Sequence, residues 1–307
     1  MYRRSPYVAA AVAVLLGGCG GGSLNSGASG NGPVALATAA DALRELGNTL
    51  NAARLAQTAL PGACSSGADN IAGPLSKPRS FVYFTGFTGT VVYENHNYAA
   101  CVDNGVTYDG LLEAGATSDG AYTYAVRGSQ TAVLLLRSSG TGSGGVPVSI
   151  GQSQVGTIET HVISSSQTER RSGLESKTEQ APQSGGSPSY TGTLSIGVPP
   201  AGPTFDVLTD SSGNGGNGSE TIAGGYSYTS TVCSGGDVTV TTPGTLLLTP
   251  SADGSYHYAS GGTLSLSSGT GSVTYTFSAS GATLSGSVSG SLSSSEVQQA
   301  FSAGSGC

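Results

Sequence analysis

Charged side chains are scarce in this sequence: Asp, Glu, Lys and Arg make up 9% of its 307 residues, and tryptophan is absent. The 11 basic residues are outnumbered by 18 acidic ones, which gives a net charge of −7. Such a chain repels phosphate backbones, so no nucleic-acid partner is expected. Binding to anionic lipid headgroups gains nothing from this charge either. The absence of tryptophan also disfavours a sugar site built on stacked rings.

Motifs for catalysis, cofactors and metals are also missing. No Cys/His spacing is typical of zinc, no Gly-x-Ser-x-Gly elbow occurs, and no glycine-rich loop with a Lys precedes a helix. The three histidines, His96, His161 and His257, lie far apart in the sequence. His161 shares a strand face with Glu159, but a solvated polar patch is favoured there over an acid–base pair. We therefore expect no enzyme activity, no cofactor and no metal.

One loop contains the oxygen-bearing residue types that are found in calcium sites. Residues 210–220 combine Asp, Ser, Asn and Glu with several glycines, and calcium binds oxygen ligands in loops. The spacing fits neither the EF-hand nor the nine-residue calcium repeat. A loop without a metal is therefore favoured.

The N-terminus has the layout of a secretory signal. Arg3 and Arg4 precede an apolar run from Tyr7 to Leu16, which is shorter than the about 20 residues of a spanning helix. The run ends in Leu16-Gly17-Gly18-Cys19, which resembles the lipobox of bacterial lipoproteins over residues 1–19.

The lipobox resemblance implies where in the cell the protein is located. In that family the signal peptide, here residues 1–18, is removed, and Cys19 carries acyl chains such as palmitate. Each buried CH₂ contributes about 0.8 kcal/mol, so several chains anchor a protein stably. Gly20 stands where Asp favours inner-membrane retention, so the resemblance implies an outer-membrane anchor, with the domain facing the periplasm or the cell surface.

Four further cysteines remain: Cys64, Cys101, Cys233 and Cys307. An even number in an exported chain predicts disulfides, with three possible connectivities. We favour Cys64–Cys101 and Cys233–Cys307, because each pair closes a loop within one half of the chain.

The sequence after Cys19 divides into three parts. Residues 19–32 are rich in Gly and Ser and predict a flexible tether. Residues 33–61 predict one amphipathic helix, which begins at Pro33 and ends at Pro61-Gly62, with leucines and alanines at three-four spacing. This apolar stripe is expected to pack on the protein's own core; a coiled coil between protomers is the alternative.

Residues 64–307 predict an antiparallel β domain. Alternation of period two, as in Val273-Tyr275-Phe277 between Ser and Thr residues, gives strands with one apolar and one hydroxylated face. Asp-Gly and Asn-Gly turns favour hairpins. The fold class expected is mainly β: a meander of hairpins forming a curved open sheet or partial barrel, covered by the N-terminal helix. A β-sandwich is the alternative.

The β domain is predicted to contain two similar lobes, 64–163 and 190–307, joined by a polar loop, 164–189. Residues 111–125 and 246–259 match in pattern: each has Leu-Leu, then Asp-Gly, then a Tyr-x-Tyr pair and an Ala. Duplication of a hairpin is one interpretation and convergence in a low-complexity chain is the other; both predict the same hairpin shape. The tyrosine pairs, 122/124, 226/228 and 256/258, are expected to pack across strands rather than to grip sugars or a partner.

Three functions are consistent with these observations. The first is a lipid-anchored envelope protein with a non-catalytic binding or structural role. It contacts the membrane through Cys19, and its possible partner is an envelope protein or an apolar ligand of unknown identity. The second is a carrier that holds an apolar ligand between the helix and the curved sheet. The third is a hydrolase, which requires a His beside a Ser or an acid in a cleft.

Overall fold

A computed structural model of the chain describes most of the region after the expected tether. The described residues are 34, 36–55, 63–81, 88–129, 131–141, 147–163, 166–185, 190–197, 204–210, 217–231, 235–254, 256–269 and 271–303. The expected signal peptide, Cys19 and the tether therefore lie outside the described residues, as do Cys233 and Cys307.

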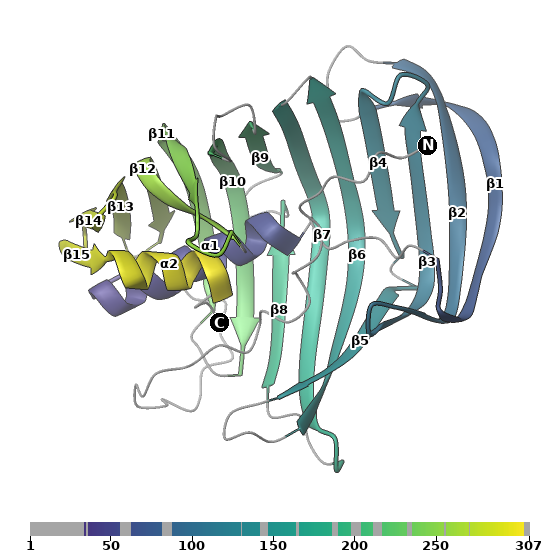
Figure 1. Cartoon of the computed structure of the whole chain (residues 1–307), viewed down its shortest axis with the longest axis horizontal. Helices are drawn as coiled ribbons and strands as arrows, with labels where there is room; N and C mark the ends of the chain where they lie inside the picture. The colour runs from purple at the N-terminus through teal and green to yellow at the C-terminus, as the bar shows by residue number, and fades with distance from the viewer. Residues whose placement is uncertain are drawn as a thin grey trace.

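The described chain is mainly β, as predicted (Figure 1). Its elements, in chain order, are α1 (Ala39–Leu55), β1 (Ser66–Ser80), β2 (Thr88–Asp103), β3 (Val106–Thr117), β4 (Tyr122–Arg127), β5 (Leu134–Thr141), β6 (Pro147–Ile163), β7 (Ser166–Pro182), β8 (Tyr190–Ile196), β9 (Phe205–Asp210), β10 (Gly218–Ser230), β11 (Gly236–Pro250), β12 (His257–Ser268), β13 (Gly271–Ser278), β14 (Gly281–Gly286), β15 (Gly290–Ser293) and α2 (Ser294–Ala303).

All fifteen strands belong to one antiparallel sheet, which is curved and open. Its main path runs from β1 to β15 in chain order, except at two places where two short strands share one position. β4 and β5 both lie between β3 and β6, and β8 and β9 both lie between β7 and β10. The curved open sheet is thus the alternative that the structure adopts, and the strands of both expected lobes lie in it.

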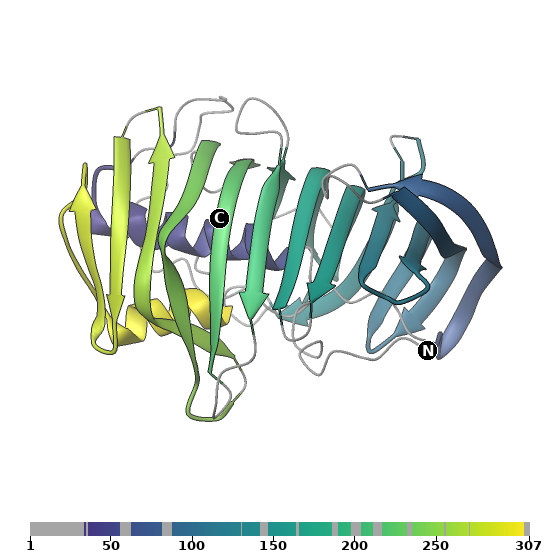
Figure 2. The same cartoon turned by 90° about the horizontal axis from the view of Figure 1, so that it is seen from above.

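Both helices pack on one face of the sheet, at its C-terminal end (Figures 1 and 2). We call this the inner face and the opposite one the outer face. Successive strand residues point to opposite faces, so Val273, Tyr275 and Phe277 are buried inside while Thr274 and Thr276 lie outside. The alternation read from the sequence therefore sets which face the helices cover.

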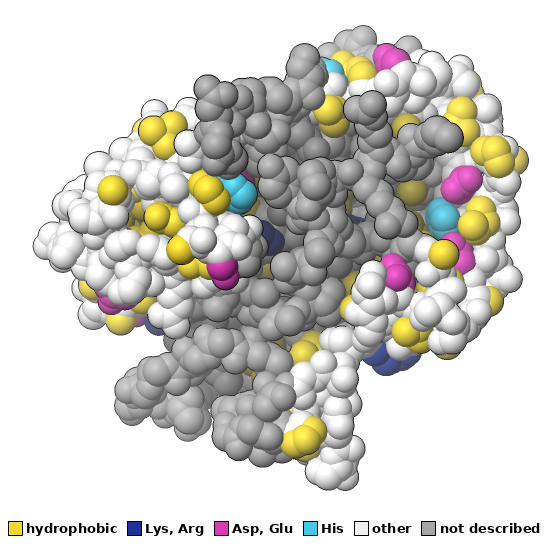
Figure 3. All heavy atoms as spheres, viewed as in Figure 1, with side chains coloured by type: hydrophobic (Ala, Val, Ile, Leu, Met, Phe, Trp, Pro, Cys, Tyr) yellow, Lys and Arg dark blue, Asp and Glu magenta, His cyan; other side chains and the backbone are white. Residues whose placement is uncertain are grey.

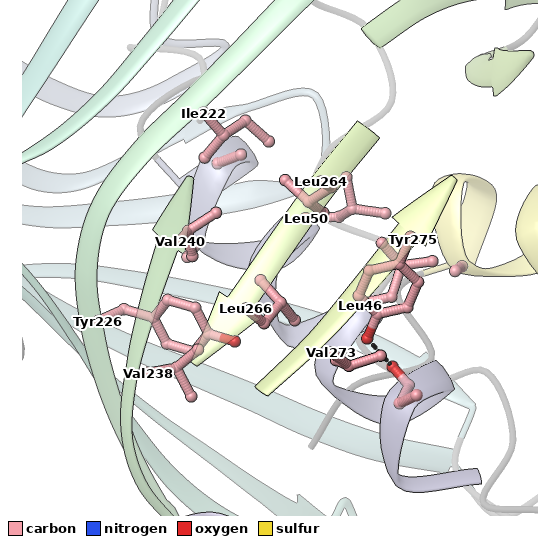
Figure 4. Close-up of a cluster of buried hydrophobic side chains, with 14 of the residues drawn as sticks. Leu46, Leu50, Ile222, Tyr226, Val238, Val240, Leu264, Leu266, Val273 and Tyr275 are labelled. Atoms are coloured by element: carbon pink, nitrogen blue, oxygen red, sulfur yellow. Dashed lines mark hydrogen bonds between the residues drawn. The ribbon is translucent and has the colours of Figure 1, made fainter. Parts of the chain in front are cut away.

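Helix α1 begins at Ala39, later than the predicted start at residue 33, and residues 56–61 of the predicted helix lie outside the described residues. Its first turn is fixed by a capping box: the Thr38 hydroxyl accepts the Asp41 N–H at 3.1 Å, and the Asp41 carboxylate accepts the Thr38 N–H at 3.0 Å. This cap places the first helical residue after Thr38 rather than at Pro33. Leu46 and Leu50 then pack against inner-face residues of β10 to β13 (Figure 4).

The sequence patterns did not predict helix α2. It too starts with a capping box, in which the Ser293 N–H donates to Glu296 at 2.7 Å and the Glu296 N–H donates to the Ser293 hydroxyl at 3.3 Å. Val297 and Phe301 join the main core. The Arg54 guanidinium of α1 donates to the Phe301 carbonyl and so links the two helices.

The expected polar loop 164–189 is wrong in its main part, because residues 166–182 form strand β7. This 17-residue strand pairs with β6 over nearly its whole length. It carries Glu, Arg, Lys and Ser in place of an apolar alternation, which is why the sequence resembles a loop. Backbone pairing with neighbours, not side-chain pattern, makes it a strand.

The two matching hairpins have the shape that the sequence predicts. In the β3–β4 turn, the Gly120 N–H donates to the Thr117 carbonyl at 2.9 Å, and the Thr117 hydroxyl also contacts Asp119. In the β11–β12 turn, the Gly254 N–H donates to the Ser251 carbonyl at 2.9 Å, and the Ser251 hydroxyl donates to Asp253 at 2.6 Å.

Candidate functional site

One disulfide is present among the described residues. Cys64 and Cys101 are joined, as expected, and this bond connects the segment before β1 to strand β2. The bridge closes a loop that contains all of β1. The expected partners Cys233 and Cys307 lie outside the described residues.

His96 tests the hydrolase hypothesis. Its Nδ1 lies 2.8 Å from Asp69 Oδ2, and its Nε2 lies 3.6 Å from Glu94 Oε2. The ring stacks on Tyr98, with 5.6 Å between centroids. Within the described ranges, both ring nitrogens thus face carboxylates and neither contacts a hydroxyl. A His–Asp pair exists, but the Ser required for nucleophilic catalysis is missing from it.

His161 and Glu159 share a face, as the sequence predicts, but they contact different groups. His161 stacks on Tyr122, with 4.2 Å between ring centroids and 3° between planes. The Glu159 carboxylate is fully buried and lies 3.5 Å from the Arg79 guanidinium. The structure therefore assigns these residues to packing and to an ion pair.

Arg79 and Glu159 belong to a group of charged and aromatic side chains on the outer face, which we call the outer-face cluster. Its members are Lys77, Arg79, Tyr93, Glu113, Tyr124 and Glu159. They come from β1, β2, β3, β4 and β6.

The cluster combines ion pairs with cation–π contacts. Lys77 Nζ lies 2.7 and 2.8 Å from the two oxygens of Glu113 and 4.1 Å above the Tyr93 ring. The Arg79 guanidinium lies 3.7 Å above the Tyr124 ring. A cation held over a ring gains about 0.5–2 kcal/mol, more where water is excluded. Burial, with the Glu113 carboxylate nearby, raises the pKa of the Tyr124 phenol well above its ordinary value.

Strand register explains how these residues meet. Tyr124 is paired with Glu159 on β6 and with Gly115 on β3, and Gly115 is paired with Tyr93 on β2. A side chain on Gly115 would lie 2.6 Å from the Tyr124 ring and 2.8 Å from Tyr93. The glycine thus leaves the space that both rings fill. Sequence reasoning missed the cluster because its cations lie in β1, whose prolines conceal the strand.

An open pocket of about 300 Å³ adjoins the cluster and shares Glu113 with it. Its lining consists of Asn95, His96, Leu111, Leu112, Glu113, Val126 and Gly128. One carboxylate, one amide and apolar surface could contact a small polar molecule. No group of three or more His, Cys, Asp or Glu in the described part of the chain is arranged to hold a metal ion.

A second buried carboxylate belongs to Glu45 of α1, which faces the inner side of the sheet. Glu45 is fully buried and accepts hydrogen bonds from Tyr228 Oη at 2.6 Å, Asn48 Nδ2 at 3.2 Å and Arg44 Nε at 3.3 Å. Burial raises the pKa of the Glu45 carboxyl, and these three donors oppose the shift without cancelling it. Tyr226 Oη lies 3.0 Å from the Thr49 hydroxyl in the same layer.

The tyrosine pairs pack within the protein, as favoured from the sequence. Tyr226 and Tyr228 are buried under α1, and Tyr124 is buried in the outer-face cluster. Tyr256 donates to Gln298 of α2 at 3.4 Å. These rings stabilise the sheet and its helices and are not displayed for a sugar.

Two further expectations concern the inner face and the Gly-rich loop. The layer between α1 and the sheet is occupied by side chains such as Leu46, Leu50 and Tyr275, where the carrier hypothesis requires a cavity (Figure 4).

In the loop 210–220, Asp210 ends β9 and Gly218 begins β10. Residues 211–216, the centre of that loop, lie outside the described part.

Comparison with known proteins found no matching family model, no matching curated protein and no matching solved structure.

Proposed function

We propose that this chain is a lipid-anchored protein of the outer membrane whose domain has a non-catalytic binding or structural role. The observation that carries the non-catalytic part is the pairing of the two buried carboxylates in the described residues. Glu159 lies against Arg79, and Glu45 accepts three hydrogen bonds. A catalytic acid or base has to reach a substrate, whereas these groups are engaged with one another.

The anchor rests on the sequence Leu16-Gly17-Gly18-Cys19. The described residues contain no helix of the length and hydropathy that crossing a bilayer requires. Acyl chains on Cys19 would supply membrane attachment without such a helix.

The residues between Cys19 and the domain fit this proposal. Val34 is buried, and its carbonyl accepts the Ser268 hydroxyl at 2.7 Å, so the folded domain extends to this position. A Gly/Ser-rich chain of the length of residues 19–32 has a root-mean-square end-to-end distance of about 20 Å. Such a tether would allow the domain to bind a partner in the envelope while anchored.

Replacement of the lipidated residue tests the proposal. Cys19→Ser should abolish incorporation of labelled palmitate and move the protein from the membrane to the soluble envelope fraction. Ser26→Ala, in the expected tether, is the matched control and should keep both the label and the membrane location. Continued labelling of Cys19→Ser would refute the anchor.

The non-catalytic part requires its own measurement. The purified chain should show no turnover above a blank with ester, phosphoester, glycoside and peptide substrates. Turnover that is lost in His96→Ala would refute this part, because the His96 ring nitrogen lies 2.8 Å from the Asp69 carboxylate, the geometry of a catalytic His–Asp pair.

A further inference from the structure

The two edges of the sheet differ in length and in what covers them. Strand β15 has four residues, and both helices contact it. Strand β1 has fifteen residues, and among the described strands it pairs only with β2. Figures 1 and 2 show β1 at the end of the molecule farthest from the helices.

An edge strand presents a row of unpaired N–H and C=O groups that can pair with another strand. Prolines and lysines at an edge oppose such pairing. In β1 these residues lie in the second half, at Pro74, Lys77, Pro78 and Arg79. The first half, Ser66–Ala72, has no proline and no cation, and nearly all of it is exposed.

The charges of β1 are directed away from the edge. Lys77 and Arg79 are held on the outer face by Glu113 and Glu159. Asp69, the acidic residue of β1, is hydrogen-bonded to His96 on β2. A second strand approaching Ser66–Ala72 would therefore meet little repulsion.

Apolar side chains flank the same edge on both faces. Of the exposed large apolar residues in the described chain, Ile71 (54% exposed) and Leu75 (44%) lie on β1, and Val92 (46%) lies on β2. Ile71 is opposite His96, so it shares a face with Val92, whereas Leu75 is opposite Tyr93 on the outer face. In Figure 3, apolar side chains are visible over the end where Figure 1 places β1 and β2.

We propose that β1 is the interface through which two copies of this chain dimerise, by antiparallel pairing of Ser66–Ala72 with the same segment of the second copy. The chemistry of the surface, an exposed backbone ladder, requires an extended strand as its partner. A second copy fits because antiparallel strands are related by a two-fold axis, which makes one edge complementary to itself. A register centred on Asn70 pairs Ala68–Ala72 of each copy with the same residues of the other. It sets Asp69 opposite Ile71 of the second copy and so keeps the two Asp69 carboxylates from lying directly opposite each other, where like charges destabilise a pair.

The proposal predicts a dimer and not a longer assembly. The edge at β15 is short and contacted by α1 and α2, so it offers no second ladder of similar length. Pairing through β1 uses the same surface on both copies and is thereby closed. The inference is independent of the lipid anchor and can be tested without it.

The test uses the full chain carrying Cys19→Ser, measured by size-exclusion chromatography with light scattering over a series of concentrations. We expect a species of twice the chain mass at high concentration. Ile71→Lys and Leu75→Lys, on opposite faces of β1, should each raise the dissociation constant by about tenfold or more. Leu247→Lys is the matched control, because Leu247 is equally exposed (55%) but lies on β11.

Hydrogen exchange gives an independent reading of the same interface. Amides of Ser66–Ala72 should become protected as concentration rises, while those of the β11–β12 turn should not change. A chain that stays monomeric at its highest soluble concentration would overturn the proposal. So would a dimer that both Ile71→Lys and Leu75→Lys leave intact, or protection of β1 only after another envelope protein is added.

Discussion

The buried carboxylate of Glu45 gives a stability prediction that the structure makes quantitative. Its side chain is fully buried between α1 and β10, and Tyr228, Asn48 and Arg44 donate to it. Glu45→Gln keeps the shape, and its amide oxygen can accept from Tyr228 and Arg44 in the place of Oε1. Its amide nitrogen takes the place of Oε2 and has to donate to the Asn48 amide oxygen, which requires the Asn48 amide to flip. The variant therefore removes the buried charge and reverses one hydrogen bond, and only the loss of the charge depends on pH.

The direction of the pH dependence follows from the raised pKa of Glu45. The folded protein binds this proton more tightly than the unfolded chain, whose pKa is near the ordinary 4.5. The contribution of Glu45 to wild-type stability therefore falls as pH rises from about that value through the raised pKa, and it levels off above it. The free energy of unfolding of Glu45→Gln relative to wild type should increase across this window, by at most about 1.4 kcal/mol per pH unit.

Urea unfolding monitored by circular dichroism between pH 4.5 and 8 measures this difference. Titrations of other groups cancel when the two proteins are compared at the same pH, and Arg44 stays charged throughout. Glu179→Gln is the matched control, because Glu179 is half-exposed, and its difference from wild type should be small and flat. A flat difference for Glu45→Gln, or one that decreases as pH rises, would refute the reasoning.

Three further changes should destabilise the fold. Gly115→Ala should lower the free energy of unfolding by about 1–3 kcal/mol in urea melts, because the added methyl meets the Tyr124 ring; an unchanged midpoint contradicts this packing. Replacing Cys64 and Cys101 together by Ser should cost about 4 kcal/mol relative to oxidised wild type, given the 37-residue separation, whereas reduced wild type should melt like the variant. Ser293→Ala should cost about 1 kcal/mol through loss of the α2 cap, and a loss in Ser295→Ala of the same size would contradict the assignment.

Part of the fold follows from local patterns in the sequence. Val273, Tyr275 and Phe277 alternate with hydroxylated residues, and this period of two defines β13 and its buried face. The Asp-Gly turns at 119–120 and 253–254 specify two hairpins of the same shape. The three-four spacing of leucines predicts α1 but not its start, which the Thr38–Asp41 capping box fixes.

Strands without such a pattern depend on their neighbours. β1 contains Pro74 and Pro78, and β7 is rich in charged residues, so neither has an alternation that predicts a strand. Each becomes a strand because a long neighbour, β2 or β6, satisfies its backbone hydrogen bonds. A pairing of this kind is non-local, and propensity read along the chain does not contain it.

The sequence by itself determined the antiparallel β class and the N-terminal helix, because alternation and helical spacing are local properties. It favoured the Cys64–Cys101 bridge among three connectivities, and the tertiary structure decided it. The tertiary structure decided which charges meet. Arg79 on β1 and Glu159 on β6 are 80 residues apart, and only the register of the intervening strands brings them within 3.5 Å. It also decided that helices contact one edge of the sheet, whereas β1 at the other edge pairs with β2 alone among the described strands. Pairing between strands, and not the composition of any one strand, sets the order of a sheet.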